Sequence, residues 1–351
     1  EDRRPYPEFI LPLISGITLV SWLIDYLSFV SEGKATSPNK FVVLATSAEY
    51  RLLMDEIRKS DRKDYLRCVA LEMHAEGDRN ISTNTNSEGM LISGSIDVSD
   101  RDLEAMLDSK SKGKIYKTLV QWCEEEIGKI PPEIADSRWL LLDKGFVLRP
   151  GEPGWRVKRL GDILLASILM IATTPVVLMA AVLIKIEDGG KVFYSQVRTG
   201  LYGKAFNIIK LRTMHERSEV RGAVWAVKDD SRITRVGRWL RRYRIDELPQ
   251  LYNVFCGDMS LIGPRPERPE IEKSLFEEIP HYRTRHWIRP GISGWAQVRM
   301  PYGASIEEAK DKLGFDLYYM KNYSLGLDFR ILVKTVSLIL RGEGSTPSSH
   351  N

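Results

Sequence analysis

The segment most suited to chemistry is a pair of adjacent carboxylates, Asp246 and Glu247, which follows a stretch dense in arginine. Between Ser231 and Arg244 the arginines stand at positions 232, 235, 238, 241, 242 and 244. One carboxylate can act as nucleophile or base while the other holds a hard cation such as Mg²⁺. Because guanidinium groups bind phosphate, this combination suits phosphoryl transfer. Surface charges, a basic helix on lipid headgroups and a nucleic-acid site are the alternatives that these residues leave open.

Two further segments offer cations in defined positions. Arg265 stands between two prolines, which restrict the backbone around it, and a fixed guanidinium suits bidentate phosphate binding. Lys210 and Arg212 lie two residues apart, so in a strand they would share one face and could together bind a diphosphate. Gly200 and Gly203 precede them and predict a hairpin turn.

Other common site patterns are missing from the sequence. It contains no Walker A loop, no HExxH, no GxSxG and no zinc-binding pattern, and its five histidines do not cluster at ligand spacing. The three cysteines, Cys68, Cys123 and Cys256, are far apart and form no CxxC pair. This usage fits a reducing, cytosol-facing location.

Length and composition suggest two folded domains with different roles. The chain has 351 residues, of which 43% are hydrophobic and 28% charged, which excludes a disordered chain, a collagen and a polytopic membrane bundle. The net charge of +4 divides into −5 over residues 1–150 and +9 over residues 151–351. The basic half therefore predicts an anionic partner.

Long apolar segments suggest contact with a membrane. Phe9–Ile24 and Ile163–Ile184 carry no charge, and the first could span a bilayer or form a buried or interfacial helix. Thr174 and Pro175 lie in the middle of the second segment, where proline predicts a bend. Two interpretations follow: a kinked spanning helix, or a helix that breaks there and returns to the same face. Arg330–Arg341 fits an interfacial helix or a buried terminal helix equally well.

Between the two apolar segments the sequence alternates between strand and helix patterns. Phe41–Ala45 predicts a buried strand and Ala48–Lys59 a helix with one apolar face. Further strands are expected within 67–73 and 90–96, and helices within 100–107 and 119–127. This alternation predicts a small α/β domain of the doubly wound type. Because it has no GxGxxG motif, we interpret it as a regulatory or dimerisation domain.

Six ordered motifs between residues 155 and 344 resemble the bacterial sugar transferase family, the monotopic phosphoglycosyl transferases. The longest is Pro290-Gly-Ile-Ser-Gly-Trp-Ala-Gln297, and Asp246-Glu-Leu-Pro-Gln250 contains the carboxylate pair. The exopolysaccharide-type branch is indicated by Glu267–Glu270, Pro301–Ser305 and Asp316–Asn322. The other matching motifs are Lys210-Leu-Arg-Thr-Met214, Asp230-Ser-Arg-Ile-Thr234, Gly257-Asp-Met-Ser260 and Gly263-Pro-Arg-Pro266.

The resemblance implies a reaction and a role for each matching residue. Asp246 would attack a nucleoside diphosphate sugar, with uridine as the expected nucleoside, and form an aspartyl-phosphosugar. A polyprenyl phosphate such as undecaprenyl phosphate would then take the sugar phosphate, which initiates exopolysaccharide or O-antigen assembly. Glu247 would hold Mg²⁺ as cofactor and Arg265 would bind phosphate. The supporting phosphate- or substrate-binding candidates are Lys210, Arg212, Asp230, Arg241 and Gln297.

The resemblance also predicts the architecture. We expect a membrane or interfacial helix in 1–35, a small Rossmann-like α/β domain in 36–150, and a monotopic α+β transferase domain in 151–344, before a disordered tail in 345–351. The helix over 160–186 would be re-entrant, with its break at Thr174 and Pro175. This places the protein on the cytosolic face of the bacterial inner membrane, without a nucleic-acid partner. The α/β domain suggests a possible homodimer. Two alternatives remain: a membrane-anchored scaffold, and a glycosyltransferase that releases the nucleoside diphosphate.

Overall fold

The computed structural model describes residues 41–60, 71–74, 87, 89–143, 145–146, 148, 151–215, 230, 232–300 and 305–342. The predicted helix in 1–35 and the predicted tail in 345–351 lie outside these residues. The chain divides into two compact units, with the boundary between Asp143 and Lys144.

The N-terminal unit contains a four-stranded sheet in which all neighbouring strands are parallel. In sheet order the strands are β2 (Leu71–His74), β1 (Phe41–Leu44), β3 (Gly89–Ile92) and β4 (Ile115–Thr118). Its helices are α2 (Ser47–Lys59), α4 (Asp100–Ser111), α5 (Leu119–Trp122), which continues as a π-helical turn over Cys123–Ile127, and α6 (Ser137–Leu142). The alternation of strand and helix predicted from the sequence is confirmed, whereas a Rossmann-like fold stays a prediction.

The core of this unit forms around the central strand. All four residues of β1 are buried, as expected for a parallel strand covered on both faces. Val42 packs with Met90 of β3 and Met106 of α4 in one apolar cluster. Thr46 then caps α2, because its hydroxyl accepts the Glu49 N–H while the Glu49 carboxylate accepts the Thr46 N–H.

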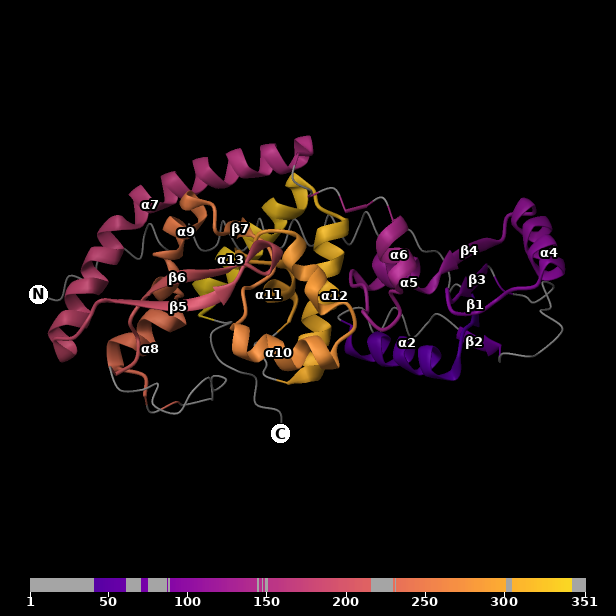
Figure 1. The fold of residues 1–351 in the computed structure, drawn as a ribbon, viewed down its shortest axis with the longest axis horizontal. Helices are drawn as coiled ribbons and strands as arrows, with labels where there is room; N and C mark the ends of the chain where they lie inside the picture. The colour runs from indigo at the N-terminus through magenta and orange to yellow at the C-terminus, as the bar shows by residue number, and fades with distance from the viewer. Residues whose placement is uncertain are drawn as a thin grey trace, which may run out of the picture. The chain divides into compact units, whose positions relative to one another are not determined.

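The C-terminal unit mixes helices with two short sheets (Figure 1). The strands β5 and β6 form the predicted antiparallel hairpin, and β7 pairs in parallel with β8. In chain order the elements are α7 (Pro153–Asp188), β5 (Phe193–Thr199), β6 (Ala205–Leu211), α8 (Arg235–Arg242), α9 (Gln250–Cys256), β7 (Ser260–Ile262), α10 (Pro269–Glu278), β8 (Gly291–Ser293), α11 (Trp295–Arg299), α12 (Ile306–Lys321) and α13 (Leu325–Arg341).

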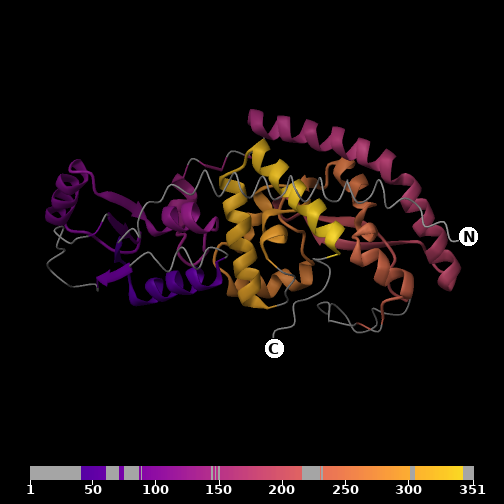
Figure 2. The same ribbon diagram turned by 180° about the vertical axis from the view of Figure 1, so that it is seen from behind.

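The long apolar segment forms a single bent helix, α7 (Figures 1 and 2). The predicted break at Thr174 and Pro175 is not an interruption, because helical structure continues through both residues. Pro175 cannot donate a backbone hydrogen bond, but the hydroxyl of Thr174 donates to the Met170 carbonyl at 2.7 Å. Thr173 donates to Leu169 in the same way, also at 2.7 Å. Both hydroxyls therefore bond to carbonyls one turn earlier, and the helix continues through Pro175 without unwinding.

Both ends of α7 contact the same folded unit. Near its start, Lys158 donates to Asp328 of α13 at 2.8 Å. Near its end, Ala180 and Ile184 pack with Leu240 of α8 in an apolar cluster. Each end therefore has its own attachment to the C-terminal unit.

The middle of α7 remains largely uncovered. It is a helix long and apolar enough to cross a membrane, and only 11% of its most apolar 18-residue stretch is buried. Ile171 is 77% exposed and Leu178 is 61% exposed. Such an apolar surface on a helix anchored at both ends indicates contact with lipid.

Helix α13 has features of both predicted alternatives, an interfacial helix and a buried terminal helix. Leu327 and Ile331 are buried, and the helix contacts β7, β8 and α11. Leu325 and Phe329 are 61% and 58% exposed. One side of α13 therefore belongs to the core while large apolar side chains remain on its surface.

Candidate active site

The carboxylate pair lies on a short 3₁₀ turn between α8 and α9. The turn spans Ile245–Glu247, and both Asp246 and Glu247 are buried. The preceding residue, Arg244, has a φ of 51°, in the left-handed region that non-glycine residues rarely adopt. This conformation reverses the chain after α8 and presents two consecutive acidic side chains inside the protein.

Glu247 is the centre of a cluster of ion pairs. Its Oε1 accepts hydrogen bonds from Lys210 Nζ at 3.0 Å and from Arg265 Nη2 at 2.7 Å. Its Oε2 accepts from Arg244 Nη1 at 3.3 Å. Although burial opposes ionisation, the charges of Arg265, Lys210 and Arg244 hold the pKa of Glu247 well below its usual range. Glu247 is therefore ionised and fixes three cations around one point.

Asp246 has a different environment although it is the adjacent residue. Its carboxylate forms no hydrogen bond with the residues that the structure describes. Burial and the neighbouring charge of Glu247 raise the pKa of Asp246 from 3.8 to about 6, and Lys210 and Arg241 limit the rise. The pKa values of Asp246 and Glu247 are shifted in opposite directions, so the two carboxylates can take different roles. Asp246 is the candidate nucleophile because its carboxylate has no hydrogen bond to a described residue.

Contacts between α9 and β6 bring Lys210 to the carboxylates. The Asn253 side chain accepts from the Ile209 N–H at 3.1 Å and donates to the Asn207 carbonyl at 2.8 Å, as a neighbouring strand would. Gly237 of α8 packs directly on the chain after β6, where a Cβ would lie 2.2 Å from the Thr213 carbonyl oxygen. Both helices can therefore lie close to the hairpin, which places the 3₁₀ turn beside the end of β6.

The Arg265 loop rests on the small β7–β8 sheet. The Gly263 N–H donates to the Ser293 carbonyl, and the Gly291 N–H donates to the Pro264 carbonyl. Gly263 and Gly291 are packed so closely that a Cβ on Gly291 would lie 2.1 Å from the Gly263 nitrogen. Gly263 and Gly291 belong to two of the family motifs, and larger residues at these positions would separate the strands that hold the loop.

A buried ion pair supports Arg265 from behind. Arg285 Nη2 donates to the Arg265 carbonyl at 2.9 Å and to Asp316 Oδ2 at 3.1 Å. Arg285 also lies over the ring of Tyr282, 5.0 Å from its centroid. Arg285 therefore fixes the backbone of Arg265, so that the Arg265 side chain points at Glu247 from a rigid support.

The other predicted site residues lie at different distances from the pair. Arg241 donates to Thr213 Oγ1 at 2.8 Å, and its charge acts on Asp246 and Asp230. Ion pairing with Arg232 keeps the pKa of Asp230 below its usual range. Asp230 is thus linked to the site through Arg241.

Arg212 and Gln297 have partners elsewhere. Arg212 forms an ion pair with Asp188 at the end of α7, so it does not accompany Lys210 at the carboxylates. Gln297 Nε2 donates to the Ile292 carbonyl at 3.1 Å, which attaches α11 to β8. Its buried Oε1 has no hydrogen-bond partner among the described residues.

The donor set is compatible with a magnesium ion held partly by substrate. Asp246 and Glu247 supply carboxylate oxygens, and no cluster of three or more acidic, histidine or cysteine side chains occurs in the described part of the chain. Mg²⁺ is usually bound by one or two carboxylates, with substrate phosphates and water completing its octahedron. The carboxylate pair therefore fits this ion only together with a phosphate-bearing ligand.

Comparison with known proteins assigns the unit that carries this site. A family model described as bacterial sugar transferase matches residues 154–342, which is more than half of the chain. The chain belongs to the bacterial sugar transferase family. This confirms the resemblance drawn from the motifs, and the match covers the carboxylate pair, the Arg265 loop and α7 within one sugar transferase domain.

Individual relatives carry more detailed names. Over 189 residues the chain is 49% identical to an Aeromonas hydrophila UDP-N-acetylgalactosamine-undecaprenyl-phosphate N-acetylgalactosaminephosphotransferase, covering 54% of this chain and 45% of that protein. It is 40% identical over 232 residues to a Caulobacter vibrioides UDP-glucose:undecaprenyl-phosphate glucose-1-phosphate transferase, covering 63% and 85%. It is also 40% identical to a Rhizobium leguminosarum exopolysaccharide production protein, covering 54% and 98%. The chain thus spans under half of the first relative.

The structure adds residues to the sugar transferase site that sequence reasoning did not single out. Arg244 and Arg285 each stand among many other arginines, and Asp316 lies in a helical segment far along the chain. The left-handed backbone of Arg244 has no sequence signal, since glycine or asparagine would be expected there. Burial of the Arg285–Asp316 pair follows only from the packing of the segment after α10 against α12.

Proposed function

We propose that the protein transfers a sugar 1-phosphate from a nucleoside diphosphate sugar to a polyprenyl phosphate, with Asp246 as the nucleophile. The donor is a UDP-sugar and the acceptor is undecaprenyl phosphate, as the names of the relatives indicate for those proteins. The observation that carries the proposal is the contrast between two adjacent carboxylates: Asp246 forms no hydrogen bond with the described residues, whereas Glu247 forms ion pairs with three cations.

The reaction proceeds in two displacements at one phosphorus atom. An Oδ of Asp246 attacks the sugar-linked phosphorus, the bond to the bridging oxygen of the diphosphate breaks, and the nucleoside monophosphate leaves with the bonding electrons. A phosphate oxygen of the polyprenyl phosphate then attacks the same phosphorus, and the Asp246 carboxylate is released. This covalent scheme divides one difficult transfer into two steps and is ping-pong.

The cations around Glu247 would bind the phosphates in both steps. Lys210 and Arg265 each donate only part of their hydrogen-bonding capacity to Glu247, and Arg241 acts on Asp246 from the other helix. A magnesium ion held by Glu247 and the substrate would neutralise phosphate charge during transfer. Placing these groups before the reaction is the main way in which a protein accelerates phosphoryl transfer.

The membrane arrangement in this proposal is re-entrant. Both ends of α7 attach to the sugar transferase domain, and its exposed apolar middle lies in the cytosolic leaflet of the bacterial inner membrane. A soluble sugar nucleotide and a lipid phosphate can then meet at one interface. The N-terminal α/β domain is a Rossmann-like unit in this proposal. It regulates the transferase or forms a homodimer.

A product assay tests the proposal. The full chain in detergent is incubated with Mg²⁺, undecaprenyl phosphate and, in turn, UDP-glucose, UDP-galactose, UDP-N-acetylgalactosamine and UDP-N-acetylglucosamine. We expect release of UMP and a lipid-linked sugar diphosphate with one or a few donors, and no turnover by Asp246→Asn. Release of UDP would identify a glycosyltransferase instead. Folded protein without turnover on any donor would favour a non-enzymatic scaffold.

A trapping experiment isolates the covalent step. With a UDP-sugar labelled in the sugar and no lipid acceptor, label is expected on the wild-type protein and absent from Asp246→Asn. Glu277→Gln, which removes an exposed carboxylate from α10, serves as the matched control and is expected to trap label as the wild type does. Equal labelling of all three proteins would exclude Asp246 as the nucleophile.

A further inference from the structure

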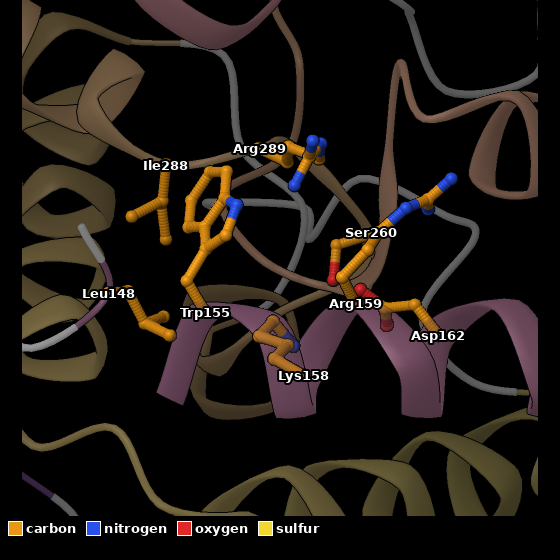
Figure 3. A pocket seen from close by; sticks show the side chains of 8 residues that line it. All are labelled: Leu148, Trp155, Lys158, Arg159, Asp162, Ser260, Ile288 and Arg289. Carbon is orange, nitrogen blue, oxygen red and sulfur yellow. The ribbon is translucent and has the colours of Figure 1, made fainter. Parts of the chain in front are cut away.

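A small cavity lies at the start of α7, where this helix meets β7 and the segment before β8 (Figure 3). Trp155, Lys158, Arg159 and Asp162 of α7 line it together with Arg289. Figure 3 shows the Arg289 side chain beside the indole ring of Trp155, and its guanidinium carbon is 4.5 Å from the ring centroid. Three lining side chains are thus cationic, whereas one is acidic.

Two of these charged groups already have partners. Lys158 Nζ donates to Asp328 Oδ2 at 2.8 Å, and both side chains are largely buried. Asp162 Oδ1 accepts the backbone N–H of Leu261 at 3.1 Å. These bonds attach the start of α7 to α13 and β7, so Lys158 and Asp162 have structural roles.

Among the described residues, the hydrogen bonds of the two arginines go to backbone carbonyls. Arg159 donates to the Val254 oxygen at 2.6 Å and to the Phe255 oxygen at 2.9 Å, and Arg289 Nε donates to the Gly257 oxygen at 2.8 Å. All three carbonyls belong to the C-terminal end of α9, whose dipole favours cations. Among the described residues, no carboxylate forms an ion pair with either guanidinium.

The positive charge of the two guanidinium groups is only partly offset by Asp162, which lines the same cavity. Burial and the charge of Arg159 lower the pKa of Arg289 although Asp162 acts in the opposite direction. Arg289 forms no second hydrogen bond with any described residue, so both of its terminal amino groups remain available. A phosphate oxygen near them would accept these donors and relieve the repulsion.

The arginine pair is separate from the carboxylate pair. Asp246 and Glu247 precede the first residue of α9, whereas the carbonyls that hold the arginines belong to its last turn and the residue after it. A seven-residue helix is about 10 Å long, at about 1.5 Å per residue. A phosphate at the arginine pair therefore cannot be the one that Asp246 attacks.

Exposed apolar side chains flank the arginine pair. Val157, Leu160 and Leu164 recur at helical spacing on α7 and are 52%, 59% and 56% exposed. On α9, Tyr252 and Phe255 are 54% and 46% exposed. Cationic groups and a tryptophan beside such a surface are typical of the boundary between headgroups and acyl chains.

We propose that Arg159 and Arg289 bind the phosphate of an anionic membrane phospholipid that is not a substrate. Its acyl chains would lie on the exposed apolar side chains of α7 and α9, and its phosphate would bridge the two guanidinium groups. The bound lipid would hold the start of α7 and the end of α9 at the membrane surface. The proposal rests on the membrane contact of α7, and it does not depend on the catalytic role of Asp246.

Lipid binding to the full chain in a neutral detergent tests the proposal. The probes are dihexanoyl phosphatidylglycerol, dihexanoyl phosphatidylcholine and inorganic phosphate, each titrated by calorimetry without any sugar nucleotide. We expect phosphatidylglycerol to bind more tightly than the other two probes. Arg289→Gln should weaken this binding about ten-fold or more, because it removes charged hydrogen bonds to the phosphate.

Two further variants complete the design. Arg283→Gln is the matched control, because Arg283 is also an arginine over an aromatic ring, 4.7 Å from the centroid of Phe276, and should bind phosphatidylglycerol as the wild type does. Arg289→Lys keeps the charge but loses the planar fork, and should bind with intermediate affinity. It replaces Arg289→Gln in the comparison if that variant does not fold.

Several results would overturn the proposal. Unchanged phosphatidylglycerol affinity in a folded Arg289 variant would exclude the arginine pair as its site. Equal binding of phosphatidylcholine would show that the site does not distinguish anionic from zwitterionic headgroups, which contradicts the choice of an anionic phospholipid. Equal binding of inorganic phosphate would identify a site for free phosphate and not for lipid.

Discussion

Replacing Asp246 with asparagine is expected to abolish turnover and, at the same time, to stabilise the folded protein. In the folded chain, burial and the charge of Glu247 raise the pKa of Asp246 from 3.8 to about 6. A shift of this size corresponds to about 3 kcal/mol of differential free energy between the two protonation states. Asparagine has nearly the same shape but carries no charge, so it removes this penalty.

The sign of the effect depends on pH in a defined way. The unfolded chain loses the Asp246 proton near pH 3.8, whereas the folded chain keeps it until about pH 6. Because the folded state binds more protons within this window, the free energy of unfolding falls as the pH rises through it. The penalty is complete above about pH 6, so Asp246→Asn should gain up to about 3 kcal/mol at pH 7.5 and less than about 1 kcal/mol at pH 4.0.

Thermal unfolding in detergent measures this difference. For a domain of this size, about 3 kcal/mol corresponds to a rise in Tm of about 6–12 °C, so a clear rise is expected at pH 7.5 and little change at pH 4.0. Glu277→Gln controls for the loss of one exposed carboxylate and should leave the Tm nearly unchanged at both pH values. An Asp246→Asn protein that is no more stable than the wild type at pH 7.5, or equally stabilised at both pH values, would refute the reasoning.

Three further predictions follow from the same geometry. In the first half-reaction, kcat/KM for the sugar nucleotide should rise with pH through about 6 as Asp246 ionises. A flat profile from pH 5 to 8 would contradict this. The lipid acceptor is omitted from the assay because phosphate monoesters also titrate near pH 6. Glu247→Gln should destabilise the protein by about 3–5 kcal/mol in denaturant unfolding, because it removes the buried negative charge that pairs with three cations, and a loss below about 1 kcal/mol would disprove the ion-pair cluster. In a cysteine-free background, Glu152→Cys and Gly189→Cys, at the two ends of α7, should react with a membrane-impermeant maleimide from the cytosolic side only, whereas labelling from opposite sides would show that α7 spans the membrane.

Much of the site could be predicted from residue types and their order. Two such features can be recognised without knowing the fold. One is the pair of adjacent acidic residues after an arginine-rich stretch, and the other is an arginine between two prolines. The family motifs depend on the same local features, and the family match confirms them. The α/β alternation of the N-terminal unit is also local, because each strand and helix follows from its own pattern of apolar residues.

The helix α7 shows where local reasoning stops. Its length, its apolar composition and the effect of Pro175 follow from the sequence, including the support from the Thr174 hydroxyl. The sequence does not show whether the chain unwinds there or continues as a helix, and the structure shows a helix that continues through Pro175. The attachment of both ends to one unit depends on contacts with α8 and α13, which lie far along the chain.

The sequence by itself determined the chemical groups available to this protein, namely two carboxylates, an excess of cations and an apolar helix. Only the tertiary structure decided which carboxylate is ionised and paired and which is left without a hydrogen bond. Lys210 reaches Glu247 across 37 residues, while Arg212, two positions further along, pairs with Asp188 at the end of α7. The reason is physical: pKa values and ion pairs depend on burial and on distances of a few ångströms, and the packing of α9 against β6 sets both.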